Sequence, residues 1–166
     1  MKTLYRLLGI IGVFFMVQSC QYNDICTAET PGTPKLLIQF YNADRPGLLK
    51  EVEGFNAKAI GDTAYYFESP VTDTIVALPL NTNTSKTSYE FVIYQDDSTK
   101  IKHDTISFTY KTEDVFISRA CGFKDIFTDF EVEWELSNTG WIKNRRIIDT
   151  TKRITNERKA PLYIYY

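Results

Sequence analysis

Four acidic residues alternate with apolar residues along one short stretch of the chain, which places their carboxylates on one face of a β-strand. They are Asp129, Glu131, Glu133 and Glu135. Such a group could bind a cation or supply a catalytic carboxylate pair. The alternative is a salt ladder across a hairpin, because residues 138–140 fit a three-residue turn ending in glycine. In that register Lys143 faces the last carboxylate, Arg145 faces the one before it, and Arg146 has no acidic partner, so the pattern favours ion pairing.

The only imidazole of the chain belongs to His103, in a polar stretch that predicts a loop at residues 100–104. A Ser/His/Asp site assembles in space rather than in sequence, so spacing alone leaves a hydrolase open, but a surface histidine is favoured. A zinc site here would have to be rich in carboxylates, which is unusual, and no glycine-rich phosphate loop is present. We therefore expect no catalytic residue, no metal and no cofactor.

Composition limits the classes of protein that the chain can belong to. Its 166 residues fit one ordinary domain, and 19 basic against 21 acidic residues give a net charge of −2. Without a basic surplus, sequence-independent binding to nucleic acid is disfavoured. Apolar residues make up 43% of the chain, which argues against disorder.

The N-terminus has the features of an export signal. Lys2 and Arg6 precede an apolar run at residues 7–17, which is too short to span a bilayer. The following Met-Val-Gln-Ser-Cys, residues 16–20, resembles a lipobox, the site where signal peptidase II cuts and the cysteine receives a lipid. We expect residues 1–19 to be removed and Cys20 to be lipidated. A plain secretory signal that happens to end near a cysteine is the alternative.

Lipidation of Cys20 leaves Cys26 and Cys121 as one possible pair, and we predict a disulfide between them. It would close a loop of about 95 residues, which the chain-entropy model values at roughly 4 to 5 kcal/mol. Residues 20–33 then form a short tether and residues 34–166 a single β domain. The free chain between the lipid and Cys26 reaches at most about 20 Å, so the domain should lie against the membrane surface.

An abundance of Thr and Ile over Leu and Ala favours strands over helices. We predict an all-β fold, a two-layer antiparallel β-sandwich, with a partly open β-barrel as the alternative. The apolar C-terminus should be a paired strand. The ten predicted strands are residues 35–41, 50–57, 64–68, 74–78, 87–95, 105–111, 116–120, 127–136, 141–149 and 162–166.

Five aspartates are followed by a hydroxyl residue and then by Ala, Ile or Thr. The pattern resembles the O-glycosylation motif that Bacteroidota use on exported proteins. The possible acceptors are Thr63, Thr74, Ser98, Thr105 and Thr150. The alternative is that Asp-Thr pairs simply mark where strands begin and end.

Several short runs carry a resemblance to a known family: residues 24–26, 33–36, 78–81, 118–123 and 163–166, of which Ser-Arg-Ala-Cys-Gly is the most specific. They are similar to a family of Bacteroidota lipoproteins, domain-of-unknown-function family 6452. The resemblance implies a lipoprotein with a disulfide and no assigned activity. Because residues 21–24 hold one acid, we expect an outer-membrane lipoprotein on the periplasmic face rather than the cell surface.

The sequence therefore predicts a non-enzymatic, lipid-anchored envelope protein that binds or scaffolds another envelope component. Its expected partners are the membrane, through the lipid, and an envelope protein, with no nucleic acid. A small-ligand or glycan-binding module is the alternative, with a hydrolase less favoured. The aromatic platform of a glycan site would come from Tyr65, Tyr66, Phe67 or Trp141.

Overall fold

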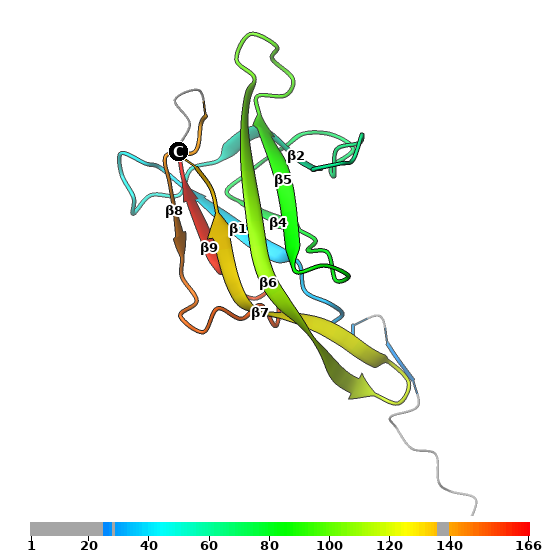
Figure 1. The fold of residues 1–166 in the computed structure, drawn as a ribbon. Coiled ribbons are helices and arrows are strands. Elements are labelled where there is room, and N and C mark those ends of the chain that lie inside the picture. The colour runs from blue at the N-terminus through cyan, green and yellow to red at the C-terminus, as the bar shows by residue number, and fades with distance from the viewer. Residues whose placement is uncertain (1–24, 28, 136–139) are drawn as a thin grey trace, which may run out of the picture. The chain divides into compact units, whose positions relative to one another are not determined.

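The computed structural model describes residues 25–27, 29–135 and 140–166 (Figure 1). Residues 1–24, with the predicted signal peptide and Cys20, lie outside this range, as do Ser137 and most of the predicted turn at 138–140. The chain divides into two compact units. Pro31–Val115 and Lys124–Tyr166 form the larger unit, and the described residues up to Thr30 join Phe116–Phe123 in the smaller one. No helix in the described ranges is long and apolar enough to cross a membrane.

All regular structure in the described residues is β-strand, which confirms the predicted all-β class. The strands are β1 (Leu36–Tyr41), β2 (Val52–Ala59), β3 (Val71–Asp73), β4 (Ile75–Leu78), β5 (Lys86–Ile93), β6 (Lys102–Ser118), β7 (Gly122–Glu133), β8 (Asn144–Ile147) and β9 (Leu162–Tyr165).

The strands form two sheets, as expected for a sandwich (Figure 1). One has the order β4-β1-β9-β8 and the other β3-β2-β5-β6-β7. β9 lies between β1 and β8, so the C-terminal strand is paired on both sides, as predicted. Its pairing with β1 is parallel, unlike the other strand pairs whose register is described.

Alternating side chains fill the space between the two sheets. In β1 every second residue, beginning with Leu36, is fully buried, as expected for a strand with one face on the core. Phe rings from five strands, β1, β2, β5, β6 and β7, continue this core, each close to the next, with centroids 5.2 to 6.5 Å apart. They are Phe40, Phe55, Phe91, Phe108 and Phe130. These aromatic contacts hold the sandwich together.

The predicted strand at residues 64–68 is wrong. This segment is irregular, and the structure has a short strand, β3, just after it. The reason is the buried side chain of Asn56 on β2, whose amide donates to the carbonyl of Phe67 and accepts from its N–H, at 3.0 and 3.1 Å. The Asn56 side chain thus takes the backbone hydrogen bonds of Phe67 that a neighbouring strand would otherwise make.

Two other predicted boundaries are corrected. The predicted strands at 105–111 and 116–120 are not separate, because β6 runs without a break from Lys102 to Ser118 through the exposed residues between them. β6 also starts at Lys102, which places His103 on a strand rather than in a loop. The predicted strand at 141–149 shortens to β8, because the N–H groups of Trp141 and Ile142 bond to Asp104 instead of a neighbouring strand.

Candidate functional site

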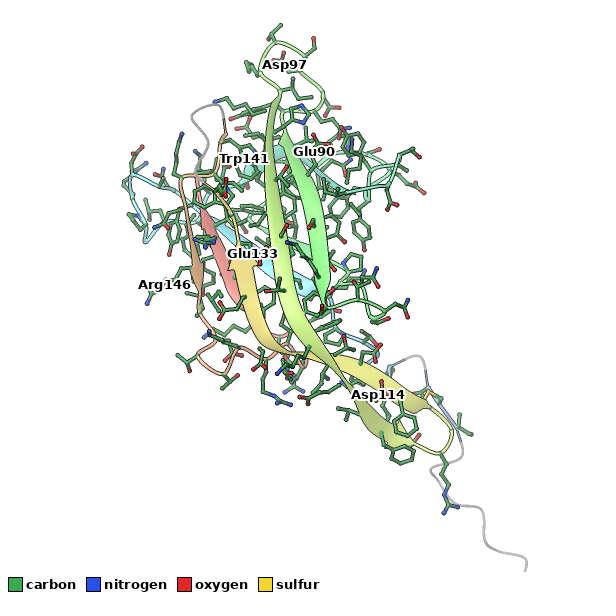
Figure 2. The ribbon with its side chains drawn as sticks, in the orientation of Figure 1. Glu90, Asp97, Asp114, Glu133, Trp141 and Arg146 are labelled. Carbon is green, nitrogen blue, oxygen red and sulfur yellow. A yellow bond between two sulfur atoms is a disulfide. The ribbon has the colours of Figure 1, made fainter. Side chains whose placement is uncertain are left out.

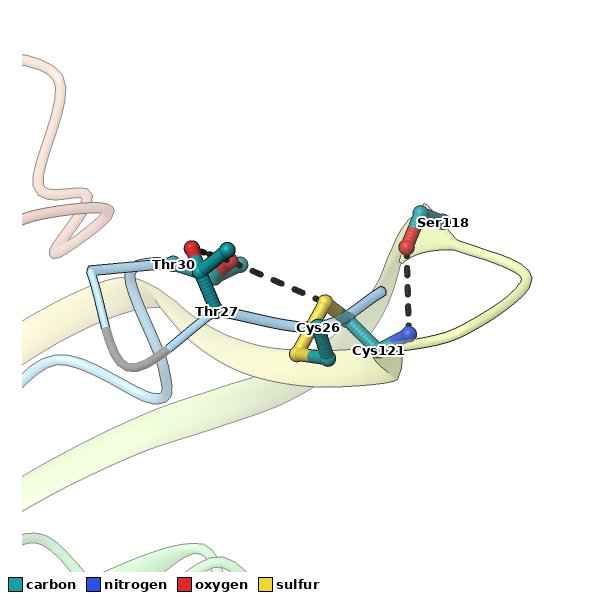
Figure 3. Close-up of a disulfide and its surroundings, with 5 residues drawn as sticks. All are labelled: Cys26, Thr27, Thr30, Ser118 and Cys121. Carbon is teal, nitrogen blue, oxygen red and sulfur yellow. Dashed lines mark hydrogen bonds between the residues drawn. A yellow bond between two sulfur atoms is a disulfide. The ribbon is translucent and has the colours of Figure 1, made fainter. Parts of the chain in front are cut away.

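The smaller unit is organised by a disulfide at a hairpin turn (Figure 3). β6 ends at Ser118 and β7 begins at Gly122, whose φ of +70° is the left-handed conformation that glycine adopts readily. The Ser118 hydroxyl accepts from the N–H of Cys121 at 3.0 Å. Cys121 is bonded to Cys26, with Cα atoms 4.9 Å apart, within the range typical of disulfides. The predicted pairing of these cysteines is therefore confirmed.

The carboxylate face of β7 has the predicted alternation but not the predicted partners. Exposed acidic residues alternate with Phe130, Val132 and the half-buried Trp134. β8 pairs with β9 in the other sheet, so the hairpin register that matched Lys143 and Arg145 to these acids is wrong.

Other lysines neutralise the carboxylates of β7. Lys111 lies 2.8 Å from Asp129 and Lys86 lies 2.6 Å from Glu133, while Lys152 pairs with Glu131. The ammonium group of Lys111 lowers the pKa of Asp129 below its ordinary value. These pairs support the salt-ladder interpretation of the stripe, and no cluster of three His, Cys, Asp or Glu side chains suited to a metal occurs in the described part of the chain.

Arg145 does not join the predicted salt ladder but connects the two sheets. Its guanidinium donates to the carbonyl of Val132 at 2.9 Å and lies over the Trp134 ring, 5.7 Å from the centroid. Arg146, the next residue, is exposed on β8 opposite Tyr163 (Figure 2). The cation of Arg146 is thus displayed on the surface.

His103 belongs to a polar cluster that crosses three strands of the larger sheet. Its Nδ1 lies 3.1 Å from Glu90, which Lys58 also contacts at 2.9 Å (Figure 2 labels Glu90). The ammonium of Lys58, and more weakly His103, hold the pKa of Glu90 below its ordinary value. The arrangement is that of cross-strand ion pairs on the outer face of a sheet.

A shallow cleft of about 460 Å³ lies beside this cluster, lined by His103, Asp104, Thr105, Ser107, Glu133, Trp134 and Glu135. The Nε1 of Trp134 is buried and has no hydrogen-bond partner among the described residues. Sequence reasoning did not identify this cleft, because it arises where β6 and β7 lie side by side.

The aromatic residues suggested as a glycan platform do not form one. Trp141 is 3% exposed and packs against Phe40 and Tyr166, so it is a core residue (Figure 2). Phe67 is half-buried against Phe55, which leaves Tyr66, at 38% exposed, as the most accessible ring of the set.

Three of the five aspartates of the proposed glycosylation motifs bond to the backbone of the residues that follow them. The carboxylates of Asp73, Asp97 and Asp149 each accept an N–H one or two residues ahead. In Asp97, bonds from the hydroxyl of Thr99 and then from Lys100 lower the carboxyl pKa to about 2. These are the local turns that the alternative interpretation describes. Of the acceptors, Thr74 is half-buried, and the others are exposed: Thr63, Ser98, Thr105 and Thr150.

The fold and the cysteine pair define a disulfide-bonded β-sandwich. Within this class, the model of a Family of unknown function (DUF6452) matches residues 57–166, more than half of the chain, and the chain belongs to that family. The resemblance to family 6452 inferred from the sequence is thereby confirmed for residues 57–166, while the lipoprotein character stays a prediction. No curated protein and no solved structure matches the chain.

Proposed function

We propose that the chain is a non-enzymatic, lipid-anchored envelope protein that binds or scaffolds another envelope component. The observation that carries the proposal is the Cys26–Cys121 disulfide, which fixes the folded chain six positions after the lipobox cysteine, Cys20. A disulfide is typical of oxidising compartments such as the periplasm. A tether this short suits a protein that works at the membrane surface rather than one that diffuses away.

The arrangement of the titratable side chains supports a binding role over a chemical one. Most of the candidate acid and base residues of the sequence are engaged in ion pairs: His103 with Glu90, and Asp129, Glu131 and Glu133 with lysines. Pairs of this kind stabilise the outer face of a sheet. Paired groups with lowered carboxyl pKa values are poor general acids.

The anchor is tested by the mass of the mature N-terminus. The expected product begins at Cys20 and carries a lipid, and the Cys20→Ala variant should lose both the lipid and the membrane association. An unmodified wild-type N-terminus would overturn the proposal. Because the acid-poor segment 21–24 favours the periplasmic face, the wild-type protein should resist protease added to intact cells and be cleaved once the outer membrane is opened.

The partner is tested by crosslinking in cells. An affinity tag belongs in the exposed loop at residues 82–85, because the C-terminal carbonyl of Tyr166 accepts hydrogen bonds from Ala43 and Lys50. The proposal expects one envelope protein at near-equal amount, whose capture is reduced by replacement of the exposed Arg146. Recovery of the chain alone would count against a scaffold.

The cleft beside Trp134 supports a second candidate function, the binding of a small polar ligand. It combines an indole ring with carboxylate, hydroxyl and imidazole groups, a mixture suited to polar ligands. Titration with a panel of monosaccharides and disaccharides should change the tryptophan fluorescence of the wild type but not of Trp134→Phe. An unchanged wild-type signal across the panel would remove this candidate.

A further inference from the structure

Three large apolar side chains of the smaller unit are more than half exposed. Ile25 is 77% exposed, Phe116 55% and Phe123 66%. The two Phe rings, one on each strand of the hairpin, pack edge to face with centroids 5.3 Å apart, so they form a joint apolar surface rather than two isolated side chains. We call these three residues the tip cluster. Apolar clusters that stay exposed mark interaction surfaces.

The hairpin holds the tip cluster in a fixed geometry. Phe116 and Phe123 stand on either side of the turn at residues 119–121, whose Cys121 is bonded to Cys26. Ile25 directly precedes the cysteine of the other arm. Arg119, in the turn itself, is also exposed and adds a cation to the same end of the hairpin. An apolar surface with an adjacent cation suits the boundary between lipid headgroups and acyl chains.

The length of chain before the disulfide identifies the occupant of this surface. Cys26 follows Cys20 by six positions, which span at most about 20 Å when fully extended. A lipid on Cys20 therefore keeps Cys26, and with it Cys121, within that distance of the bilayer. The bilayer is then an apolar phase that is always within reach of Phe116 and Phe123.

We propose that the tip cluster inserts into the membrane interface beside the lipid anchor, so that the protein is attached by its acyl chains and by Ile25, Phe116 and Phe123 together. This inference rests on the lipid anchor proposed above. The lipid attaches the chain to the membrane, and the tip cluster determines which surface of the protein faces the bilayer.

The test uses the lipidated full chain in vesicles of phosphatidylethanolamine and phosphatidylglycerol with brominated acyl chains, which quench indole fluorescence by contact. Phe123→Trp adds an indole at the tip, and the emission of Trp134 and Trp141 is subtracted with the wild type. The added emission of this variant should be quenched at least twice as strongly as that of the control Ile60→Trp. Ile60 is 59% exposed and lies in the larger unit. Phe116→Trp provides a second position should the first variant fold poorly.

The outcomes separate the two proposals. Equal quenching in the tip and control variants, or none at the tip, would overturn the docking while a lipid found on Cys20 keeps the anchor. A blue-shifted tip emission without quenching would mean that protein covers the cluster, a second copy or another partner, and would also overturn it. A mature chain without a lipid on Cys20 would remove the anchor itself.

Discussion

Replacement of Asp104 is the most direct test of how the two sheets are joined. Asp104 lies on β6, is 6% exposed, and accepts from the N–H groups of Trp141 and Ile142 at 2.5 and 2.8 Å. These two residues lead directly into β8 of the other sheet. One carboxylate oxygen thus satisfies two buried backbone donors that have left the strand ladder.

The magnitude follows from those two donors. In Asp104→Ala both N–H groups remain buried without an acceptor, and each such group costs about 1–3 kcal/mol. The expected loss in the free energy of unfolding is about 2–6 kcal/mol, or roughly 6–18 °C in melting temperature at about 3 °C per kcal/mol for a domain of this size. Glu133→Ala is the matched control, since its exposed pair with Lys86 is worth about 0–1 kcal/mol.

The assay is urea unfolding of the purified chain, followed by tryptophan fluorescence. A β-carbon added at Gly140 would overlap the Asp104 carboxylate, so Gly140→Ala should destabilise the wild type. It should do so far less in the Asp104→Ala background, because the overlapping group is gone. A loss below about 1 kcal/mol for Asp104→Ala, or strictly additive effects of the two changes, would refute the reasoning.

Three further predictions follow from the strand pairing and the ion pairs. Cys121→Ser should lower stability by roughly 2–5 kcal/mol, and peptide mapping without reductant should recover Cys26 and Cys121 in one linked peptide; free thiols would contradict it. Deletion of residues 162–166 should prevent folding, seen as lost β signal in circular dichroism, because β8 loses its neighbour in the sheet and β1 keeps only β4. Lys58 lowers the pKa of Glu90, so this carboxylate contributes stability above its ordinary pKa, near pH 4.3, that is lost as pH falls through the lower folded value. Glu90→Gln should therefore flatten the fall in stability on the acid side of this ordinary pKa, and an unchanged slope there would argue against this.

The strands that sequence analysis placed correctly are those whose side-chain alternation is enforced by burial. Residues 105–111 alternate because Ile106, Phe108 and Tyr110 face the core, and the position of this strand was right for that reason. Alternation along one strand does not reveal which strand lies beside it. The acids of β7 were matched to the next strand in sequence, whereas β8 crosses to the other sheet.

The errors arise where side chains replace backbone pairing. Asn56 captures the backbone of Phe67, and Asp104 captures the N–H of Trp141, each across a distance in sequence that no local pattern encodes. The disulfide was predictable because few cysteines were available to pair. The cleft beside Trp134 was not predictable, because it depends on which residues of β6 lie beside those of β7.

The tip cluster could be predicted from the sequence only in part. Phe116 lies three residues before the turn at 119–121 and Phe123 two residues after it, and Gly122, which directly follows the turn, is the residue type that signals a hairpin there. Recognition of that hairpin alone would have placed both residues close to its turn, one on each strand. The turn motif does not predict that the two Phe side chains are exposed, because apolar residues at these positions could equally belong to a buried core. Exposure, combined with the short chain from Cys20, is what turns an ordinary aromatic pair into a surface that points to the membrane.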